Sequence, residues 1–154
     1  MRQPAVNNLP DTILRSWHRC TDLGVIEDQI PYAEPLTHAE LLVLREASGE
    51  LLSIVEPELD FLGEMFHGTD SVVLLANPNG MILDARGTGE FLDKAGQVAL
   101  KSGVVWSESA RGTNAIGTAI AVRHPVQIHS AEHYCAGIKR WTCSSTVILD
   151  PYDS

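Results

Sequence analysis

The chain has 154 residues, about the length of one domain, and its hydrophobic fraction of 44% excludes global disorder. It carries 20 Asp and Glu against 11 Lys and Arg, and this net charge of −9 argues against direct binding of nucleic acid or of an anionic membrane surface. No apolar run approaches the roughly 20 residues that a membrane span needs, and three cysteines are too few for a disulfide scaffold, so we expect a cytoplasmic protein.

The first predicted element is a helix in the N-terminal segment. Asp11 is predicted to cap it, and Gly24 to end it. The following residues, 25–35, contain two prolines and show no helical period, so they are predicted to form a connection. We therefore expect residues 1–35 to be a helical arm that precedes a domain over 36–154. The apolar stripe of this helix consists of Ile13, Leu14, Trp17 and Cys20.

Two entry helices are predicted over residues 37–67. Thr37 and Glu40 have the spacing of a capping box, in which each side chain binds the other residue's backbone amide. Apolar residues then recur at helical spacing as far as Val55. Pro57 lacks an amide donor, so the first helix is expected to stop or kink near Val55 and a second to run over 58–66.

The remaining pattern, over residues 70–150, predicts the sheet and the loops of a pocket. Two apolar runs at 71–76 and 81–85 flank the tight-turn sequence Asn77-Pro78-Asn79-Gly80 and predict a β-hairpin. A helix follows in the pattern, and residues 113–122 fit either a short helix or a buried loop. Strands are expected at 125–129 and 142–150. The fold class is therefore α+β, with a central antiparallel sheet flanked by helices.

Several short motifs in the second half of the chain resemble one known family. They are Gly112-Thr113-Asn114-Ala115-Ile116-Gly117-Thr118-Ala119, Pro125-Val126-Gln127-Ile128-His129, Ala131-Glu132-His133-Tyr134 and Trp141-Thr142-Cys143-Ser144, with Ser16-Trp17-His18-Arg19-Cys20 near the start. In this order they resemble the N-terminal GAF sensory domain of sigma-54-dependent transcriptional activators of the acetoin and glycerol regulator type. The resemblance extends from about Ile13 to Pro151.

The resemblance implies a regulatory rather than a catalytic role. We expect a GAF-like domain that senses a small metabolite and passes the signal to an ATPase and DNA-binding part. That part is not in this sequence, which contains no G-x-x-x-x-G-K-[ST] motif. Family members continue past a turn like Asp150-Pro151 into a further strand, so we expect the last strand of the sheet to be missing. The alternative is a protein-interaction module that binds a regulatory protein and no small ligand. A homodimer is expected in either case.

The predicted ligand pocket lies between Val104 and Trp141, where apolar faces alternate with a few polar groups. The alternative interpretation is that the tryptophans belong to the core and that the polar side chains satisfy loop backbone. The candidate residues are Trp106, Glu108, Asn114, Thr118, His129, Glu132, His133, Trp141 and Cys143.

Metal binding and thiol chemistry are the rival hypotheses. His129 and His133 are four residues apart and Cys135 and Cys143 follow, but a strand end separates the histidines and there is no C-x-x-C pair. We therefore expect no metal and no cofactor. Some proteins of the GAF fold are thiol enzymes that reduce methionine sulfoxide, which needs a reactive cysteine such as Cys135. Nothing else in the sequence supports catalysis, so no enzyme is expected.

Overall fold

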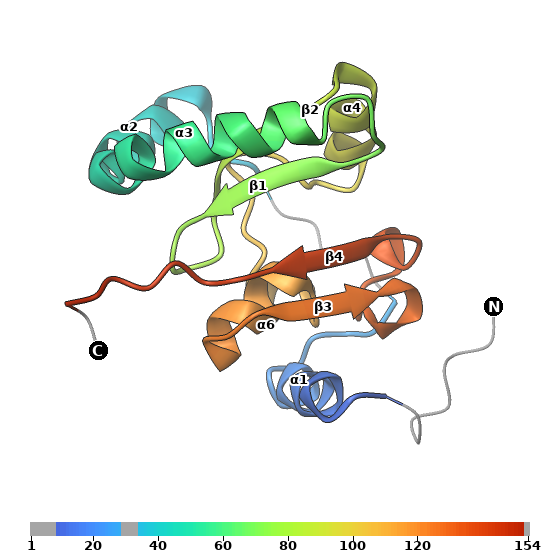
Figure 1. Ribbon diagram of the computed structural model, residues 1–154. Helices are drawn as coiled ribbons and strands as arrows, with labels where there is room; N and C mark the ends of the chain where they lie inside the picture. The colour runs from blue at the N-terminus through green and yellow to red at the C-terminus, as the bar shows by residue number, and fades with distance from the viewer. Residues whose placement is uncertain (1–8, 29–33, 153–154) are drawn as a thin grey trace. The chain divides into compact units, whose positions relative to one another are not determined.

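The computed structural model describes residues 9–28 and 34–152, which form helices and antiparallel strands in an α+β arrangement (Figure 1). The chain divides into two compact units, residues 33–105 and residues 1–32 with 106–154. Part of the predicted connection, 29–33, lies outside the described residues. The boundary expected after residue 35 stays a prediction. Within the described ranges, no helix is long and apolar enough to cross a membrane.

The unit formed by residues 33–105 consists of a β-hairpin covered by helices. Its strands pair antiparallel, with a register shift between Leu75 and Ala76, and the predicted hairpin is confirmed. Both α3 and α4 contact both strands, and α2 contacts β2. Figure 1 shows α3 lying along the hairpin. The elements of this unit are α2 (His38–Ala47), α3 (Gly49–Met65), β1 (Val72–Ala76), β2 (Ile82–Gly87) and α4 (Gly89–Gln97).

The helix break in this unit lies before the predicted position. The capping box of Thr37 and Glu40 is confirmed at the start of α2. The break predicted near Pro57 is wrong, because α3 runs through this proline and the chain leaves helical geometry at Ser48 instead. Ser48 is followed by glycine, a poor helix former. Pro57 removes one helical hydrogen bond, but Leu59 is only 5% exposed, so packing holds the helix together beyond the proline.

The unit formed by residues 1–32 and 106–154 is built around a short antiparallel ladder, whose buried face packs against two helices. Val126 and Ile128 of the ladder are buried with Ile13, Ala115 and Ala119 in one hydrophobic cluster. The N-terminal helix is therefore part of this core. The elements of this unit are α1 (Asp11–Asp22), α5 (Glu108–Arg111), α6 (Ala115–Val122), β3 (Val126–His129), β4 (Thr142–Ser145) and two 3-10 helices, Ser130–Glu132 and Ala136–Ile138.

Two predicted boundaries in this unit are wrong. Asp11 does not cap α1: Pro10 occupies the N-cap position, and Asp11 in the first turn pairs with Arg15. The strand predicted over 142–150 ends at Ser145, which pairs with Val126. The next residue of the opposite strand would be Pro125, and a proline has no amide to continue a ladder.

Other predicted features are confirmed with refinements. Gly24 ends α1 at φ +73°, and the amides of Gly24 and Val25 donate to the carbonyls of Thr21 and Cys20. Residues 113–122, for which a helix or a loop was expected, contain α6. The described strands form two separate two-stranded antiparallel sheets, one in each unit.

Candidate functional site

The contact between α5 and α6 positions several of the predicted pocket residues. Asn114 caps α6 by accepting a hydrogen bond from the amide of Gly117, and its own amide group donates to the Gly112 carbonyl. Gly117 is required there, because a Cβ at this position would lie 2.6 Å from the Glu108 nitrogen and 2.7 Å from the Trp106 oxygen. The backbones can approach this closely only without a side chain. This contact places α5 directly against α6.

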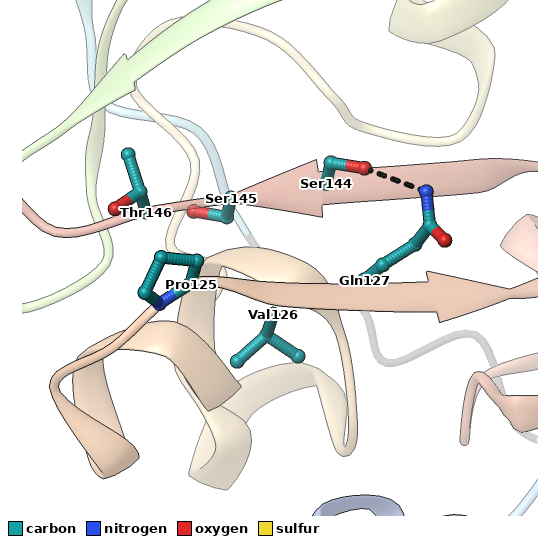
Figure 2. Close-up of a pocket in the computed structure, with 6 residues that line it drawn as sticks. All are labelled: Pro125, Val126, Gln127, Ser144, Ser145 and Thr146. Carbon is teal, nitrogen blue, oxygen red and sulfur yellow. Dashed lines mark hydrogen bonds between the residues drawn. The ribbon is translucent and has the colours of Figure 1, made fainter.

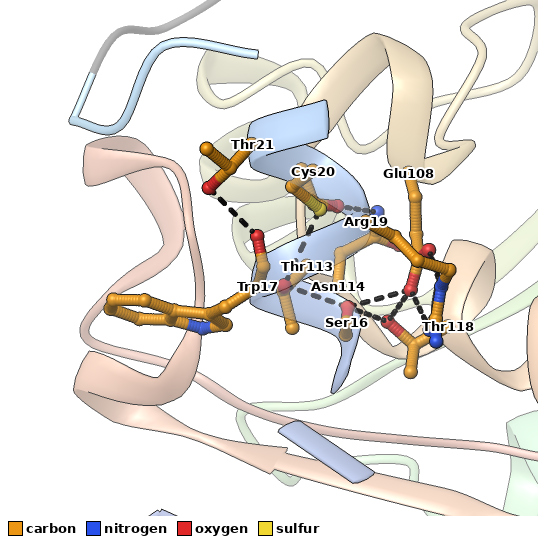
Figure 3. A network of polar contacts seen from close by, with 10 residues as sticks. Ser16, Trp17, Arg19, Cys20, Thr21, Glu108, Thr113, Asn114 and Thr118 are labelled. Carbon is orange, nitrogen blue, oxygen red and sulfur yellow. Dashed lines mark hydrogen bonds and ion pairs between the residues drawn. The ribbon is translucent and has the colours of Figure 1, made fainter. Parts of the chain in front are cut away.

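Glu108 is the centre of a buried polar network that reaches α1 (Figure 3). Its Oε1 accepts hydrogen bonds from the hydroxyl of Ser16 at 2.6 Å and from that of Thr118 at 2.9 Å. Arg19 donates from Nε to Oε2 at 2.7 Å and from Nη2 to Oε1 at 2.8 Å. The Ser16 hydroxyl is also 2.7 Å from that of Thr113. Both carboxylate oxygens are therefore used by the protein itself.

The ionisation of Glu108 depends on this network. Burial opposes ionisation, but hydrogen bonds from Arg19, Ser16 and Thr118, together with the charge of Arg19, outweigh it and lower the pKa of Glu108. The carboxylate is thus charged at neutral pH and satisfied by protein donors. In this arrangement Glu108 positions α1, and both of its oxygens already accept hydrogen bonds from the protein.

Trp106 lies beside a buried cation. The guanidinium carbon of Arg111 is 5.1 Å from the centre of the indole ring, within the range of a cation–π contact. Both residues are 2% exposed, and burial lowers the pKa of Arg111. Trp106 is therefore a core residue that shields a charge.

His129 and Glu132 meet at the end of β3, where the chain turns. The Glu132 carboxylate accepts from the backbone amide of His129 at 2.7 Å, and His129 Nδ1 lies 2.6 Å from the Thr142 hydroxyl. The indole nitrogen of Trp17 in α1 donates to the Glu132 carbonyl at 2.9 Å. This turn, residues 129–134, is thus a second place at which α1 is attached.

His133 differs from the other predicted residues in having an unsatisfied polar atom. Its side chain is fully buried, and its Nδ1 lies 2.9 Å from the Ser130 carbonyl, which can only accept, so Nδ1 carries the proton. Nε2 is then an acceptor, and it has no hydrogen-bond partner among the described residues. Burial, with the nearby charges of His129 and Lys139, lowers the pKa of His133 to about 4, so the ring is neutral at pH 7.

The cysteines lie in environments that suppress thiol reactivity. Cys135 is buried, and its thiol donates to the Arg111 carbonyl at 2.6 Å. Burial raises the pKa of Cys135 and that of Cys143 to about 11. Within the described ranges, no group of three or more His, Cys, Asp or Glu side chains is placed to hold a metal ion.

An open depression of about 560 Å³ lies at the Val126 end of the β3–β4 ladder (Figure 2). Its polar groups are neutral, and two of them, the Gln127 amide and the Ser144 hydroxyl, bind each other at 3.1 Å. None of the predicted pocket residues lines it. The lining residues are Pro125, Val126, Gln127, Ser144, Ser145 and Thr146.

The structure gathers the predicted residues into two groups and leaves others apart. Glu108 and Thr118 are in direct contact, with Asn114 in the same turn; His129, Glu132 and His133 share the turn after β3. Trp141 and Cys143 are partly buried, Cys143 against the hydrophobic cluster.

Sequence reasoning missed Ser16 and Arg19, which donate to the Glu108 carboxylate, and Thr113, which joins the network through the Ser16 hydroxyl. One signal was present: Ser16 falls within the apolar stripe of α1, where a hydroxyl needs a buried partner. Arg111 was also missed. Its signal was the presence of a charged residue in a stretch of small residues.

These observations define an α+β domain of GAF-like fold. Most of its predicted pocket groups interact with other groups of the protein itself. The chain belongs to the MimR N-terminal domain family, whose model matches residues 3–153.

Comparison with individual proteins points to transcriptional regulators. The chain is 33% identical over 140 residues to the acetoin dehydrogenase operon transcriptional activator AcoR of Bacillus subtilis, covering 88% of this chain and 22% of that protein. It is 30% identical over 150 residues to the propane 2-monooxygenase operon transcriptional activator MimR of Mycolicibacterium smegmatis, covering 91% and 23%. The chain spans about a fifth to a third of the length of the curated relatives it matches.

A solved structure supports the fold. The E. coli DhaR(N)–DhaL complex contains a chain that matches with a TM-score of 0.85 and 17% identity, over 92% of this chain and 48% of that chain. The predicted family and the GAF-like α+β fold are thereby confirmed.

Proposed function

We propose that this chain is the signal-receiving domain of a sigma-54-dependent transcriptional activator in the bacterial cytoplasm. The observation that carries the proposal is the match of the MimR N-terminal domain model to residues 3–153. Relatives named as activators of the acetoin dehydrogenase and propane 2-monooxygenase operons support it. In this role the chain binds its signal without catalysing a reaction and without contacting DNA itself, and it works as a homodimer.

The proposed signal is a small neutral metabolite with a hydroxyl group. His133 supports this choice, because its buried Nε2 is an acceptor with no partner among the described residues. Such an atom is costly unless a donor reaches it. A neutral hydroxyl suits a neutral imidazole, whereas an ionised carboxylate brings only acceptors. Acetoin, glycerol, dihydroxyacetone and simple alcohols all carry such a group.

A ligand at His133 would act on α1 through the two residues beside it. The Glu132 carbonyl accepts a hydrogen bond from the Trp17 indole, and the Tyr134 ring packs edge-on against the same indole with centroids 5.4 Å apart. Movement of the 132–134 segment therefore changes both contacts of Trp17. The ligand can shift the equilibrium between two positions of α1 by no more than the difference between its binding free energies for those two positions.

Signal delivery by a regulatory protein is the second candidate function. The solved structure of similar fold is a complex of DhaR(N) with another protein, DhaL. The internal use of Glu108 and Thr118 also favours this alternative, since these side chains are taken up by the fold.

Calorimetric titration with acetoin, glycerol and dihydroxyacetone tests the proposal. We expect binding by the wild-type chain and at least a tenfold weaker affinity for His133→Phe, which keeps a planar ring but lacks the acceptor. The matched control is His124→Phe, because His124 is exposed, and its affinity should be unchanged. No heat with any of the three compounds at millimolar concentration would favour the protein-partner alternative.

A further inference from the structure

The negative charge of the chain is concentrated in one of its two units. Residues 33–105 contain 12 acidic and 4 basic side chains, a net −8 out of −9 for the whole chain. The other unit is therefore close to neutral. Within 33–105, α3 contains five carboxylates and no lysine or arginine. An acidic segment of this kind attracts a basic partner at long range.

The same helix exposes a row of large apolar side chains. Ile54 is 68% exposed, Phe61 57% and Met65 56%. Their spacing of seven and four residues places them on one face of α3. The buried residue of the helix, Leu59, points elsewhere, toward the hairpin that α3 contacts. We refer to Ile54, Phe61 and Met65 as the α3 face.

Carboxylates border the α3 face. Glu50, Glu58 and Glu64 are exposed and lie within about a turn of its apolar residues. Asp60 is engaged by Arg86, at 3.1 Å. A large apolar row with charged edges is typical of an interaction surface rather than of ordinary helix exposure.

We propose that the α3 face binds an amphipathic helix of a partner protein, one with an apolar stripe flanked by lysine or arginine. The apolar row supplies the buried area, and the acidic border selects the charge of the partner. A second copy of this chain fits less well, because α3 against α3 would bring five carboxylates on each side together. An anionic lipid surface is repelled for the same reason.

The proposal goes beyond the proposed function and does not rest on it, since the α3 face and His133 belong to different units. The probe is a synthetic 18-residue helical peptide with a leucine stripe flanked by lysines. The comparison peptide has the same stripe flanked by glutamates. We expect the lysine peptide to bind at least tenfold more tightly in a fluorescence anisotropy titration.

Methionine methyl NMR locates the binding site on the intact chain. Met65 lies on the α3 face, whereas Met81 lies beside β2 in an isolated bridge with Val105. We expect the Met65 signal to shift with the lysine peptide and the Met81 signal to stay in place. A Met65 signal that depends on protein concentration without peptide would identify a second copy as the occupant and overturn the proposal.

Substitutions distinguish binding of the peptide at the α3 face from its attraction to the overall charge of the unit. Phe61→Ala should weaken binding of the lysine peptide at least tenfold, and Glu58→Lys with Glu64→Lys should do the same. The matched control is Glu90→Lys with Asp93→Lys on α4, which changes the charge of the unit equally but on another helix. Equal losses from both charge pairs would overturn the proposal, as would equal binding of the two peptides.

Discussion

Arg19 and Glu108 form a two-point ion pair between α1 and α5, with Nε–Oε2 and Nη2–Oε1 distances of 2.7 and 2.8 Å. The two residues are 89 positions apart, so this pair connects the N-terminal helix to the second half of the chain. Glu108 is 6% exposed, while the Arg19 side chain is 37% exposed. The buried carboxylate therefore depends on Arg19, whereas Arg19 keeps some contact with water.

Neutralising Glu108 should loosen the attachment of α1. We expect Glu108→Gln to reduce the free energy of unfolding by about 2–3 kcal/mol, because hydrogen bonds to a charged group are replaced by weaker ones around a buried amide. Urea denaturation followed by tryptophan fluorescence measures the change, since Trp17 is on α1. Arg15→Ala is the matched control on the same helix, where an exposed pair with Asp11 contributes little.

A double-mutant cycle tests whether the effect passes through Arg19. If Glu108→Gln and Arg19→Met act on one interaction, their combined effect should be smaller than the sum of the single effects. Additive losses would show that the carboxylate stabilises the fold through Ser16 and Thr118 alone.

Gly117 should not tolerate even one added methyl group. A Cβ there would lie under 3 Å from three backbone atoms of residues 106–108, which cannot move as a flexible side chain does. We expect Gly117→Ala to destabilise the chain by roughly 3 kcal/mol. Gly96→Ala is the matched control within α4: a Cβ there meets nothing within 4 Å, so the change should stabilise by roughly 0.5–1 kcal/mol. Thermal melts followed by circular dichroism compare the two, and similar melting temperatures would contradict the close approach of α5 and α6.

The sequence predicted local structure better than the contacts between distant segments. The capping box of Thr37 and the hairpin around Asn77–Gly80 are confirmed, since the residues that decide them are neighbours in the chain. The sequence did not predict the break at Ser48, because the signal of the glycine that follows it is weaker than that of Pro57. Packing decides whether a helix tolerates that proline, and packing is not local.

The candidate site shows the same difference between local structure and contacts between distant segments. Glu108 and Thr118 are ten residues apart, and the sequence placed both in one segment. Their partner Ser16 is about a hundred residues away in the chain, and only the fold brings it within 2.6 Å of the carboxylate. The role of each predicted residue in ligand binding stays a prediction.

Cys135 should react slowly with alkylating agents. Its thiol is buried and donates to a carbonyl, and its pKa is raised to about 11, so little thiolate exists at neutral pH. We expect iodoacetamide to modify Cys135 in the native chain at least a hundredfold more slowly than in the urea-unfolded chain at pH 7, as measured by peptide mass spectrometry. Rapid modification near pH 6 would instead support the thiol-enzyme hypothesis.

His133 should make the chain sensitive to mild acid. Its pKa is about 4 in the folded chain against 6.5 for a free imidazole, so the unfolded chain binds the extra proton first as the pH falls. The contribution of His133 to the free energy of unfolding is therefore complete above pH 6.5 and is lost as the pH falls from 6.5 to 4. Each pH unit in this window costs up to about 1.4 kcal/mol, and the whole window about 3 kcal/mol.

The pH profile of His133→Phe separates this effect from that of Glu108. The pKa of Glu108 is lowered, so its contribution is lost only as the pH falls below about 4.5, the ordinary value of a glutamate. Between pH 6.5 and 5 the variant should show a flatter dependence of unfolding free energy on pH than wild type, whatever its stability at pH 7. His124→Phe, which removes an exposed imidazole, should retain the wild-type slope. Equal slopes in all three chains would mean that His133 is protonated as easily in the folded chain as in the unfolded one. A bound hydroxyl donor at Nε2 would lower the pKa of His133 in the folded chain further and extend the loss of stability to lower pH, because protonation of that nitrogen abolishes the hydrogen bond.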